Sequence, residues 1–384
     1  MQKVLYILKH NPWGVGGGCF ASLQYFNVFI NVFENYEFYI QICEEYMKDI
    51  PQEIFKKYHF IGVKRRSKVR TICEILFEGI LHRHYHQARK MLKSLSFSYC
   101  IFDHSSIAGS LVTLANRNGA KTIVLNHNFE PDYFADNSPY LSRIVLLPYV
   151  MKMNKRAFLK CDFNIFLSEE DSIQCMETFG KSPTRCIIGG LFEMSPCPIP
   201  RDCTFPGMGT GNIVLIITGS LSNVQNRDAL DYFLSDLYPL IPHSYQIIIA
   251  GKNPTEELIK RINESENIEL IANPKNMENI VRKGTIYICT ARKGSGVKVR
   301  ITDGLKSGLP IIAHSVSARG YSDFINKGYL ATFVSNEEFV SELNSMVNKI
   351  KKGKITRTEI SDYYFATRNI QNGINKIKKE IFIN

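Results

Sequence analysis

Short apolar runs rich in β-branched residues alternate with longer helical patterns along the whole chain. We expect strands at residues 3–8, 37–43, 59–63, 99–103, 122–127, 163–168, 212–218, 245–251, 268–272, 285–290 and 310–315. Strands that are apolar throughout and separated by helices are typical of parallel sheets covered on both faces. Ligands of such sheets bind beyond the carboxyl ends of the strands, so functional residues are expected in the loops that follow strands.

The alternation is interrupted once, where proline and glycine become frequent. We therefore predict a linker at residues 191–211 between an N-terminal domain at residues 1–190 and a C-terminal domain at residues 212–364. Residues 365–384 are helical in pattern and could pack on either domain, including back on the N-terminal one. The predicted fold class is α/β, with two doubly wound Rossmann-like domains that face each other across a cleft.

The formal charge of +11 indicates an anionic partner, namely nucleic acid, lipid headgroups or phosphorylated small molecules. Basic residues cluster at residues 64–70 and 82–93, with an apolar helical pattern between them. This arrangement favours a basic amphipathic surface that rests on an anionic membrane, although solvated helix faces would give the same pattern. Charge alone also leaves nucleic-acid binding open, but no DNA or RNA motif is present, so we predict no nucleic-acid partner.

Neither a signal peptide nor a spanning helix is predicted. The apolar run near the start covers only residues 4–8, and no run approaches the roughly 18 apolar residues that a spanning helix needs. The ten cysteines are scattered without a Cys-x-x-Cys pair, which favours reduced thiols. His82, His84 and His86 could suggest a metal, but a helical pattern scatters them. We therefore predict a cytoplasmic protein, peripheral on the inner membrane face, without a metal site.

A glycine-rich loop, "GVGGG" at residues 14–18, follows the first expected strand. Gly16 and Gly17 leave backbone N–H groups free to approach a phosphate or an acceptor. A structural turn is one alternative. A dinucleotide fingerprint is another, although five residues separate the strand from the first glycine where that fingerprint allows almost none.

His127 ends the strand at residues 122–127, and Asp103 and His104 follow at the end of the preceding strand. An imidazole in this position can transfer protons, donate a hydrogen bond to a hydroxyl, or act as a structural cap. A Ser–His–Asp hydrolase would fit these residue types. However, no Gly-x-Ser-x-Gly elbow follows any expected strand, so we discount it.

The stretch "GSGVKVRITDGLKSGLP" at residues 294–310 allows two interpretations. The alternation in residues 297–302 fits a strand in a hairpin. Alternatively, residues 296–308 form a helix whose stripe of Val297, Ile301 and Leu305 packs on the sheet. The helix keeps the sheet parallel, and it is the interpretation that we prefer.

A helix in this place would create an anion site. The backbone N–H groups of Ser295 and Gly296 would lie at its N-terminus, with Lys298 and Arg300 adding two positive charges. Asp303, one turn after Arg300, offers a carboxylate to hydroxyl groups. Cations for a diphosphate and a carboxylate for a sugar together indicate a nucleotide sugar.

These residues resemble the retaining glycosyltransferases of the GT-B fold, group 1. "GSGVKVRITDGLKSGLPIIAHSVSARGY" (residues 294–321) is similar to the family's donor-site pattern. "TGSLSNVQNRDALDYF" (residues 218–233) resembles the loop that opens their second domain, and "LKCDFNIFLSEEDSIQCMETFG" (residues 159–180) resembles the end of their first. The likeness is strong over residues 212–321 and weak elsewhere.

The resemblance implies a donor held by the second domain, an acceptor held by the first, retention, and neither a cofactor nor an obligatory metal. Lys298 and Arg300 would bind the diphosphate, Asp303 would hold donor hydroxyls, and His127 would touch the transferred sugar. The other implied contacts come from Gly219, Ser220 and Ile271. The sequence also departs from the family, because Asp303 replaces a glutamate, Ser295 stands where a second glutamate is usual, and Asn226 and Arg227 stand near a usual Arg/Lys pair.

We therefore predict a hexosyl- or related glycosyltransferase that acts on a glycan acceptor, expected to be lipid-linked, in polysaccharide or cell-surface glycan synthesis. A nucleotide-sugar epimerase of the same fold and a non-catalytic nucleotide- or glycan-binding relative remain open alternatives at this point.

Overall fold

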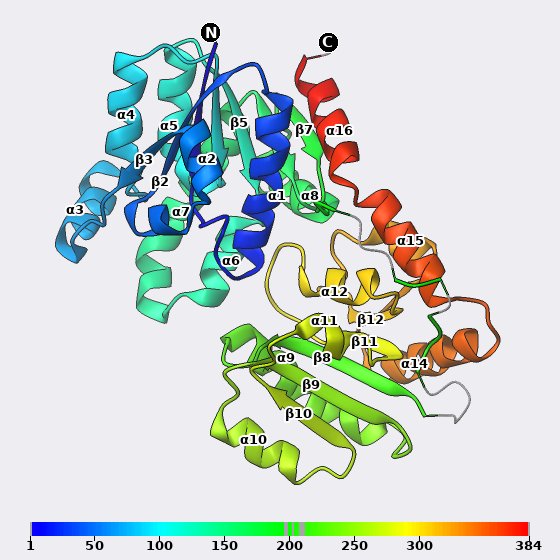
Figure 1. Ribbon diagram of the computed structural model, residues 1–384. Helices are drawn as coiled ribbons and strands as arrows, with labels where there is room; N and C mark the ends of the chain where they lie inside the picture. Colours follow the sequence, from blue (N-terminus) through cyan, green and yellow to red (C-terminus); the bar gives the residue numbers. More distant parts are fainter. Residues whose placement is uncertain (1, 196–198, 202, 207–211, 383–384) are drawn as a thin grey trace. The chain divides into compact units, whose positions relative to one another are not determined.

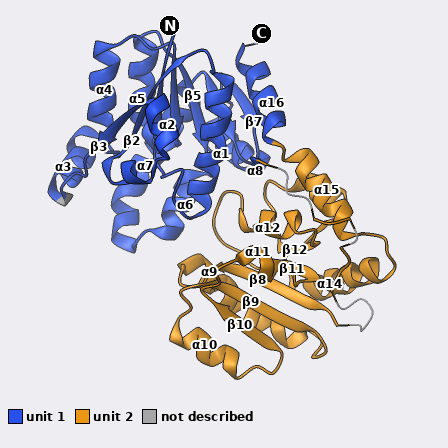
Figure 2. Ribbon diagram, viewed as in Figure 1, with its two compact units in different colours: residues 1–194, 370–384 blue, residues 195–369 orange. Residues whose placement is uncertain are grey.

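The computed structural model describes residues 2–195, 199–201, 203–206 and 212–382, which belong to two compact units (Figure 2). Unit 1 comprises Met1–Met194 and Ile370–Asn384, and unit 2 comprises Ser195–Asn369. The predicted linker at residues 191–211 lies partly outside the described residues, because positions 196–198, 202 and 207–211 are not among them.

Unit 1 contains a seven-stranded sheet in the order β3-β2-β1-β4-β5-β6-β7, in which every neighbouring pair is parallel. The strands are β1 (Lys3–Leu8), β2 (Glu37–Cys43), β3 (His59–Val63), β4 (Tyr99–Asp103), β5 (Lys121–Asn126), β6 (Phe163–Phe166) and β7 (Arg185–Ile188). The helices are α1 (Gly17–Val32), α2 (Gln52–Lys57), α3 (Lys68–Glu78), α4 (Tyr85–Ser94), α5 (Ser105–Arg117), α6 (Glu130–Asn137), α7 (Tyr140–Lys160), α8 (Glu169–Phe179) and α16 (Ile370–Phe382), and a 3-10 helix spans Glu44–Asp49. Helices lie on both faces of the sheet (Figure 1), so the central strands are buried on both sides.

Unit 2 contains a six-stranded parallel sheet in the order β10-β9-β8-β11-β12-β13. Its strands are β8 (Val214–Ser220), β9 (Gln246–Lys252), β10 (Ile268–Ala272), β11 (Ile286–Cys289), β12 (Ile311–His314) and β13 (Leu330–Phe333). Its helices are α9 (Val224–Tyr232), α10 (Glu256–Asn263), α11 (Met277–Val281), α12 (Arg300–Lys306), α13 (Ser322–Asn326), α14 (Asn336–Lys351) and α15 (Arg357–Thr367). A π-helical turn at Phe233–Leu237 and a 3-10 turn at Tyr238–Leu240 follow α9. Both units are therefore doubly wound α/β structures, as predicted.

All eleven predicted strands are present, but β7 and β13 were not predicted. Each of these two strands has only four residues and forms an edge of its sheet. An edge strand pairs on one side only, so it needs neither the length nor the continuous apolar character that marks the central strands.

The last helix, α16, belongs to unit 1 although the chain reaches it only after unit 2. Ile370 N donates a hydrogen bond to the Glu193 carbonyl oxygen at 3.2 Å, and the Phe382 ring lies edge-on to Phe33 with 5.4 Å between centroids. A Cβ on Gly373 would lie 2.5 Å from the Phe192 ring, so only glycine allows this approach. The helix lies beside α1 (Figure 1) and covers part of the unit 1 core. Residues 365–384, expected as one helix, thus contain the end of α15 and all of α16.

A buried arginine anchors the C-terminal end of α12, the helix that carries the predicted donor-site cation Arg300. The Arg357 side chain donates to the carbonyl oxygens of Ser307 at 2.8 Å, Arg282 at 3.0 Å and Thr204 at 3.4 Å, and the residue is 3% exposed. Ser307 is the residue that ends α12. Burial lowers the pKa of Arg357, but its charge is shared among these carbonyl groups.

Substitution of Arg357 tests this anchor. Arg357→Met removes the donor from three carbonyl groups, of which that of Ser307 belongs to a buried residue, so we expect a loss of about 2 kcal/mol in the free energy of unfolding of unit 2. Hydrogen exchange of the β11 and β12 amides in urea measures this loss directly. Lys352→Met, which removes an exposed cation, serves as the control. Equal stability of the two variants would contradict the anchoring role.

Candidate functional site

Each parallel sheet reverses its winding direction once, and several of the predicted site residues lie at or near these two places. In unit 1 the reversal falls between β1 and β4, where Leu8 is the register partner of Asp103. In unit 2 it falls between β8 and β11. Successive loops diverge at such a switch point and leave room for a ligand.

The predicted histidine, His127, forms a buried pair with Asp103. Its Nε2 lies 2.5 Å from one Asp103 oxygen, while the hydroxyl of Ser22 donates to the other oxygen at 2.6 Å. Asp103 is fully buried, which alone would raise its pKa, but His127, His10 and Ser22 together hold the pKa below its ordinary value. The ionised carboxylate thus accepts a hydrogen bond from the N–H of Nε2. In a neutral His127 ring Nδ1 is therefore a hydrogen-bond acceptor, and it has no hydrogen-bond partner among the described residues.

A second buried group supports the ring of His127. The His104 ring stacks on the His127 ring with 5.2 Å between centroids. The backbone of His104 has a φ of 139°, a conformation that residues other than glycine rarely adopt. Its Nδ1 lies 3.1 Å from Glu130, and the ammonium of Lys9 donates to the same carboxylate at 3.0 Å. Burial lowers the pKa of His104, so its ring is neutral and acts as packing for His127.

His10 completes this cluster and was not singled out from the sequence. Its ring lies edge-on to His104 and His127, with centroid distances of 5.7 and 5.6 Å. Burial and the neighbouring His127 lower the pKa of His10 to about 4. A Cβ on Gly18 would lie 3.0 Å from Nε2 of His10, which explains a glycine at that position. The only signal in the sequence was the place of His10, two residues after the first strand.

The glycine loop leads into α1, which begins at Gly17. Gly16 has φ of 132°, a conformation that favours glycine, and a Cβ at this position would meet nothing within 4 Å. Through Gly18 the loop lies against His10, so Gly16 and Gly17 belong to the same end of the sheet as the His127–Asp103 pair.

In unit 2, the stretch at residues 297–302 is not a strand, but the predicted helix starts later than expected. Val297 and Lys298 are non-helical and α12 begins at Arg300. The Lys298 carbonyl accepts a hydrogen bond from the Tyr321 hydroxyl at 3.1 Å, which holds the chain in a loop at this point. Ile301 and Leu305 are fully buried and Val297 is half-buried against the same core, as the predicted stripe requires. The prediction that Ser295 and Gly296 stand at the helix N-terminus is wrong, because they lie in the preceding loop.

Arg300 lies against the end of β8. Its guanidinium donates to the side-chain oxygen of Asn226 and, at 3.4 Å, to the Thr218 carbonyl. Asn226 in turn donates to the Ser220 carbonyl at 2.8 Å. A Cβ on Gly219 would lie 3.2 Å from the Arg300 guanidinium, so the bare backbone permits this approach. The structure thus brings Gly219, Ser220 and Arg300 together, with Asn226 as the link.

Both hydrogen-bond partners of Arg300 are neutral, and within the described ranges it forms no ion pair. Its positive charge is therefore not taken up by a direct ion pair, although the Asp303 carboxylate is near enough to interact with it electrostatically.

Lys298 is buried beneath the glycine loop. Gly294 and Gly296 have positive φ angles of 93° and 76°, which turn the chain sharply around Ser295. The Lys298 ammonium donates to the Ser295 carbonyl at 3.4 Å, and a Cβ on Gly294 would lie 3.0 Å from the same nitrogen and 2.8 Å from the amide nitrogen of Gln225. Gln225 is the neighbour of Asn226 on α9, so the helix that contacts Arg300 also passes close to Gly294, beside Lys298.

Of the two remaining predicted donor residues, Asp303 interacts with Arg300 electrostatically, whereas Ile271 belongs to a different strand end. Asp303 forms an ion pair with Lys306 at 3.2 Å, and its side chain is 39% exposed. Burial of its carboxyl group raises the pKa of Asp303, and the nearby Lys306 lowers this pKa in part. Ile271 is half-buried near the end of the edge strand β10.

The three histidines that were considered for a metal do not converge. His84 is buried with its Nδ1 3.0 Å from the amide nitrogen of Gln41, whereas His86 lies 3.1 Å from Glu74. His82 stacks on His84. In the part of the chain that the structure describes, no three His, Cys, Asp or Glu side chains form a group that could hold a metal ion.

Comparison with known proteins identifies chains with a similar fold. Residues 212–349 match the family model described as "Glycosyl transferases group 1". The chain resembles HepE from Anabaena in complex with UDP (TM-score 0.67, 10% identity, 99% of each chain). It also resembles sucrose-phosphate synthase from Thermosynechococcus elongatus (TM-score 0.69, 10% identity, 99% of this chain and 98% of that one). The lipopolysaccharide outer core galactosyltransferase WaaB is similar as well, with a TM-score of 0.65 and 13% identity over 100% of this chain and 99% of that one. No curated protein matches the sequence.

The chain has the GT-B fold. The segment that matches the family model contains every predicted donor residue, from Gly219 to Asp303, whereas the His127–Asp103 cluster lies outside it.

The neutral state of His10 can be measured. Because burial and His127 oppose protonation, we expect the ring resonances of His10 to titrate with a midpoint of about 4, well below the ordinary value of 6.5. At pH values between 4 and 6.5, His10 is protonated in the unfolded chain but not in the folded chain. The contribution of neutral His10 to the free energy of unfolding is therefore fully present above pH 6.5 and is lost as the pH falls towards 4.

An NMR titration of the full chain, with His10→Gln to assign the signal, makes the measurement. A midpoint close to 6.5 would show that the ring is not buried against His127.

Proposed function

We propose that this protein is a glycosyltransferase that transfers a sugar from a nucleotide-sugar donor to a glycan acceptor, with retention of the anomeric configuration. The proposal rests mainly on the position of Arg300. This cation has neutral hydrogen-bond partners and lies beside the backbone of Gly219 at the switch point of unit 2. This place lies inside the segment that matches the family model. Complexes of HepE with UDP, with UDP and glucose, and with UDP-glucose support a nucleotide sugar as donor.

The donor diphosphate binds to Arg300 and Lys298 in this proposal, with the backbone at Ser295 and Gly296 in the glycine loop beside it. Gly219 and Ser220 approach the phosphates from the end of β8. Ile271 flanks the base, and Asp303 holds hydroxyl groups of the donor sugar.

Bond cleavage leaves the nucleoside diphosphate with an additional negative charge. Arg300 and Lys298 stabilise this charge, and a guanidinium can do so through two parallel hydrogen bonds. The two cations provide the stabilisation that a bound metal supplies in other transferases, so we propose that the reaction has no obligatory metal.

The acceptor and the transferred sugar bind to unit 1 in this proposal. Asp103 fixes the orientation and the tautomer of His127, which leaves Nδ1 able to accept a hydrogen bond from a sugar hydroxyl. Gly16 and Gly17 allow the acceptor to approach the same end of the sheet. His127 therefore contacts the transferred sugar, and Asp103 positions it.

Arg300→Ala tests the donor site. Loss of charge-assisted hydrogen bonds should weaken binding of the nucleoside diphosphate about 10- to 100-fold, measured by calorimetry. Arg261→Ala is the matched control, because Arg261 is an exposed arginine of unit 2 that pairs with Asp231. Unchanged nucleotide affinity in the Arg300 variant would overturn the assignment.

The reaction type needs a separate measurement. We expect nucleotide release from the donor to require an acceptor, and proton NMR of the first product to show the anomeric configuration of the donor. Conversion of the nucleotide sugar without any acceptor would instead identify an epimerase. Tight binding without turnover would identify a non-catalytic relative.

We further propose that the acceptor is lipid-linked and that unit 1 contacts an anionic membrane surface on the cytoplasmic side. Helix α3 exposes Val69, Ile72 and Leu76 on one side, together with Phe77 at 83% exposure. Exposed arginines, Arg65 and Arg70, accompany these apolar side chains. No helix of the described residues is both long and apolar enough to cross a bilayer. The contact is therefore a peripheral one.

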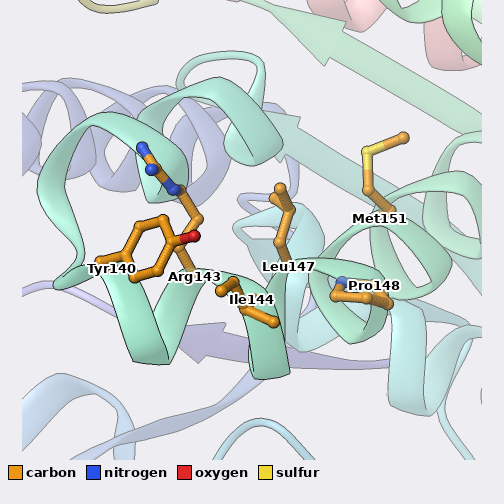
Figure 3. Close-up of a pocket in the computed structure, with 6 residues that line it drawn as sticks. All are labelled: Tyr140, Arg143, Ile144, Leu147, Pro148 and Met151. Atoms are coloured by element: carbon orange, nitrogen blue, oxygen red, sulfur yellow. The ribbon is translucent and has the colours of Figure 1, made fainter.

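A second apolar surface lies on α7. Figure 3 shows a pocket along this helix that is lined by Tyr140, Arg143, Ile144, Leu147, Pro148 and Met151. Tyr140 and Ile144 are exposed, at 66% and 56%, and Arg143 lies over the Tyr140 ring. An apolar pocket with a single cation at its edge suits a lipid chain next to an anionic headgroup.

Vesicle binding tests the membrane proposal. The double variant Ile72→Ser, Phe77→Ser should reduce co-sedimentation with vesicles rich in phosphatidylglycerol about tenfold, because two large apolar side chains no longer enter the interface. Val334→Ser, at an exposed apolar position of unit 2, is the control. Equal sedimentation of both variants would contradict the role of α3.

A further inference from the structure

Unit 1 contains a wide, basic pocket to which the proposed function assigns no ligand. It has a volume of about 810 Å³ and lies where the loops after β1, β2 and β3 meet the start of α3 and the segment before α4. Four cations line it, namely Lys9, Arg65, Arg66 and Arg83. Glu45 is the acidic residue among its lining residues.

The charges in this pocket are only partly compensated. Lys9 pairs with Glu130, Arg66 pairs with the buried Glu74, and Arg83 pairs with Glu45. Arg70 also lies on Glu74, at 2.6 Å, so that carboxylate serves two arginines. Arg65 is exposed and has no ion pair among the described residues. The cations therefore outnumber the carboxylates, and the pocket attracts an anion.

The contact between Arg83 and Glu45 indicates which anions the arginines of the pocket can bind. Its two terminal nitrogens donate to the two oxygens of Glu45 at 3.1 and 2.7 Å, and the Glu45 side chain is 46% exposed. A bidentate contact of this kind suits a phosphate as well as a carboxylate. The Glu45 side chain already reaches solvent, so an anion that replaces it on Arg83 would release its carboxylate into water. Arg83 could then join Arg65 on a ligand.

The inner end of the pocket reaches the His127 cluster. Lys9 and His10 line the pocket, and the His10 ring lies 5.6 Å from the His127 ring. The outer end includes Ile72, one of the exposed apolar residues of α3. One ligand could therefore place a sugar near His10, an anion on the arginines and an apolar chain along α3.

We propose that this pocket binds a phosphate group of the acceptor, so that the acceptor is a phosphorylated glycan. The inference rests on the proposed function and adds the chemical class of the acceptor. The phosphate can belong to a soluble sugar phosphate or to the phosphate link between a sugar and its lipid, and both present the same anion to Arg65 and Arg83.

A binding experiment isolates the pocket from the donor site. Inorganic pyrophosphate is titrated into the full-length Arg300→Ala variant, in which the proposed donor site has lost its guanidinium. The addition of Arg65→Gln and Arg83→Gln should weaken the remaining binding at least tenfold. Arg89→Gln, at an exposed arginine of α4 outside the pocket, should leave it unchanged. No pyrophosphate binding in Arg300→Ala, or binding that is indifferent to Arg65 and Arg83, would overturn the proposal.

A transfer assay then tests the acceptor class. We expect kcat/KM for a phosphorylated acceptor to exceed that for its dephosphorylated form at least tenfold, and Arg65→Gln with Arg83→Gln to abolish this preference while nucleotide affinity stays unchanged. A soluble sugar phosphate and a lipid-linked sugar diphosphate in micelles are compared. A preference for either supports the pocket and identifies the source of the phosphate. Equal use of the neutral acceptor would overturn it.

The two proposals can fail separately. If pyrophosphate binds through Arg65 and Arg83 but no nucleotide sugar is bound or converted, the glycosyltransferase function fails and the anion pocket remains. If sugar transfer proceeds equally well without an acceptor phosphate, the pocket proposal fails and the transferase remains.

Discussion

The reversal of winding direction within each parallel sheet is the constraint on which both candidate sites depend. A parallel strand needs a crossover, and two crossovers in opposite directions leave one place where neighbouring loops separate. In unit 1 this place holds Asp103 and Lys9, and in unit 2 it holds Gly219 and Arg300. The order of the strands therefore determines where each candidate site lies, and the residues at each switch point determine what that unit can bind.

The two units place charge in opposite ways. In unit 1, carboxylates are buried with imidazoles: Asp103 orients the His127 ring, and Glu130 contacts His104 and holds Lys9. In unit 2, the hydrogen bonds that Arg300 forms within the described residues go to a side-chain amide and a backbone carbonyl, and no carboxylate pairs with it there. In the proposed function, the first arrangement orients hydroxyl groups and the second neutralises the phosphates of the donor.

Much of the fold follows from local pattern, because central parallel strands are apolar throughout. The edge strands β7 and β13 lack this signal. The start of α12 was misplaced, since the Tyr321 hydroxyl holds the Lys298 carbonyl in a loop, and no residue near Lys298 in the chain reveals that partner. Similarly, Ser22, Asp103 and His127 are distant in sequence and meet only because β1, β4 and β5 are neighbours. Individual residues could be predicted from their positions after strands, but their partners required the sheet order.

The return of the chain to unit 1 through α16 has a consequence for biosynthesis. Ribosomes make the seven strands of unit 1 first, yet the helix that covers α1 and meets Phe33 emerges only after unit 2 is complete. During that interval the apolar surface beneath α16 faces solvent or a chaperone. Unit 1 therefore reaches its final packing last, although its strands are the first to be synthesised.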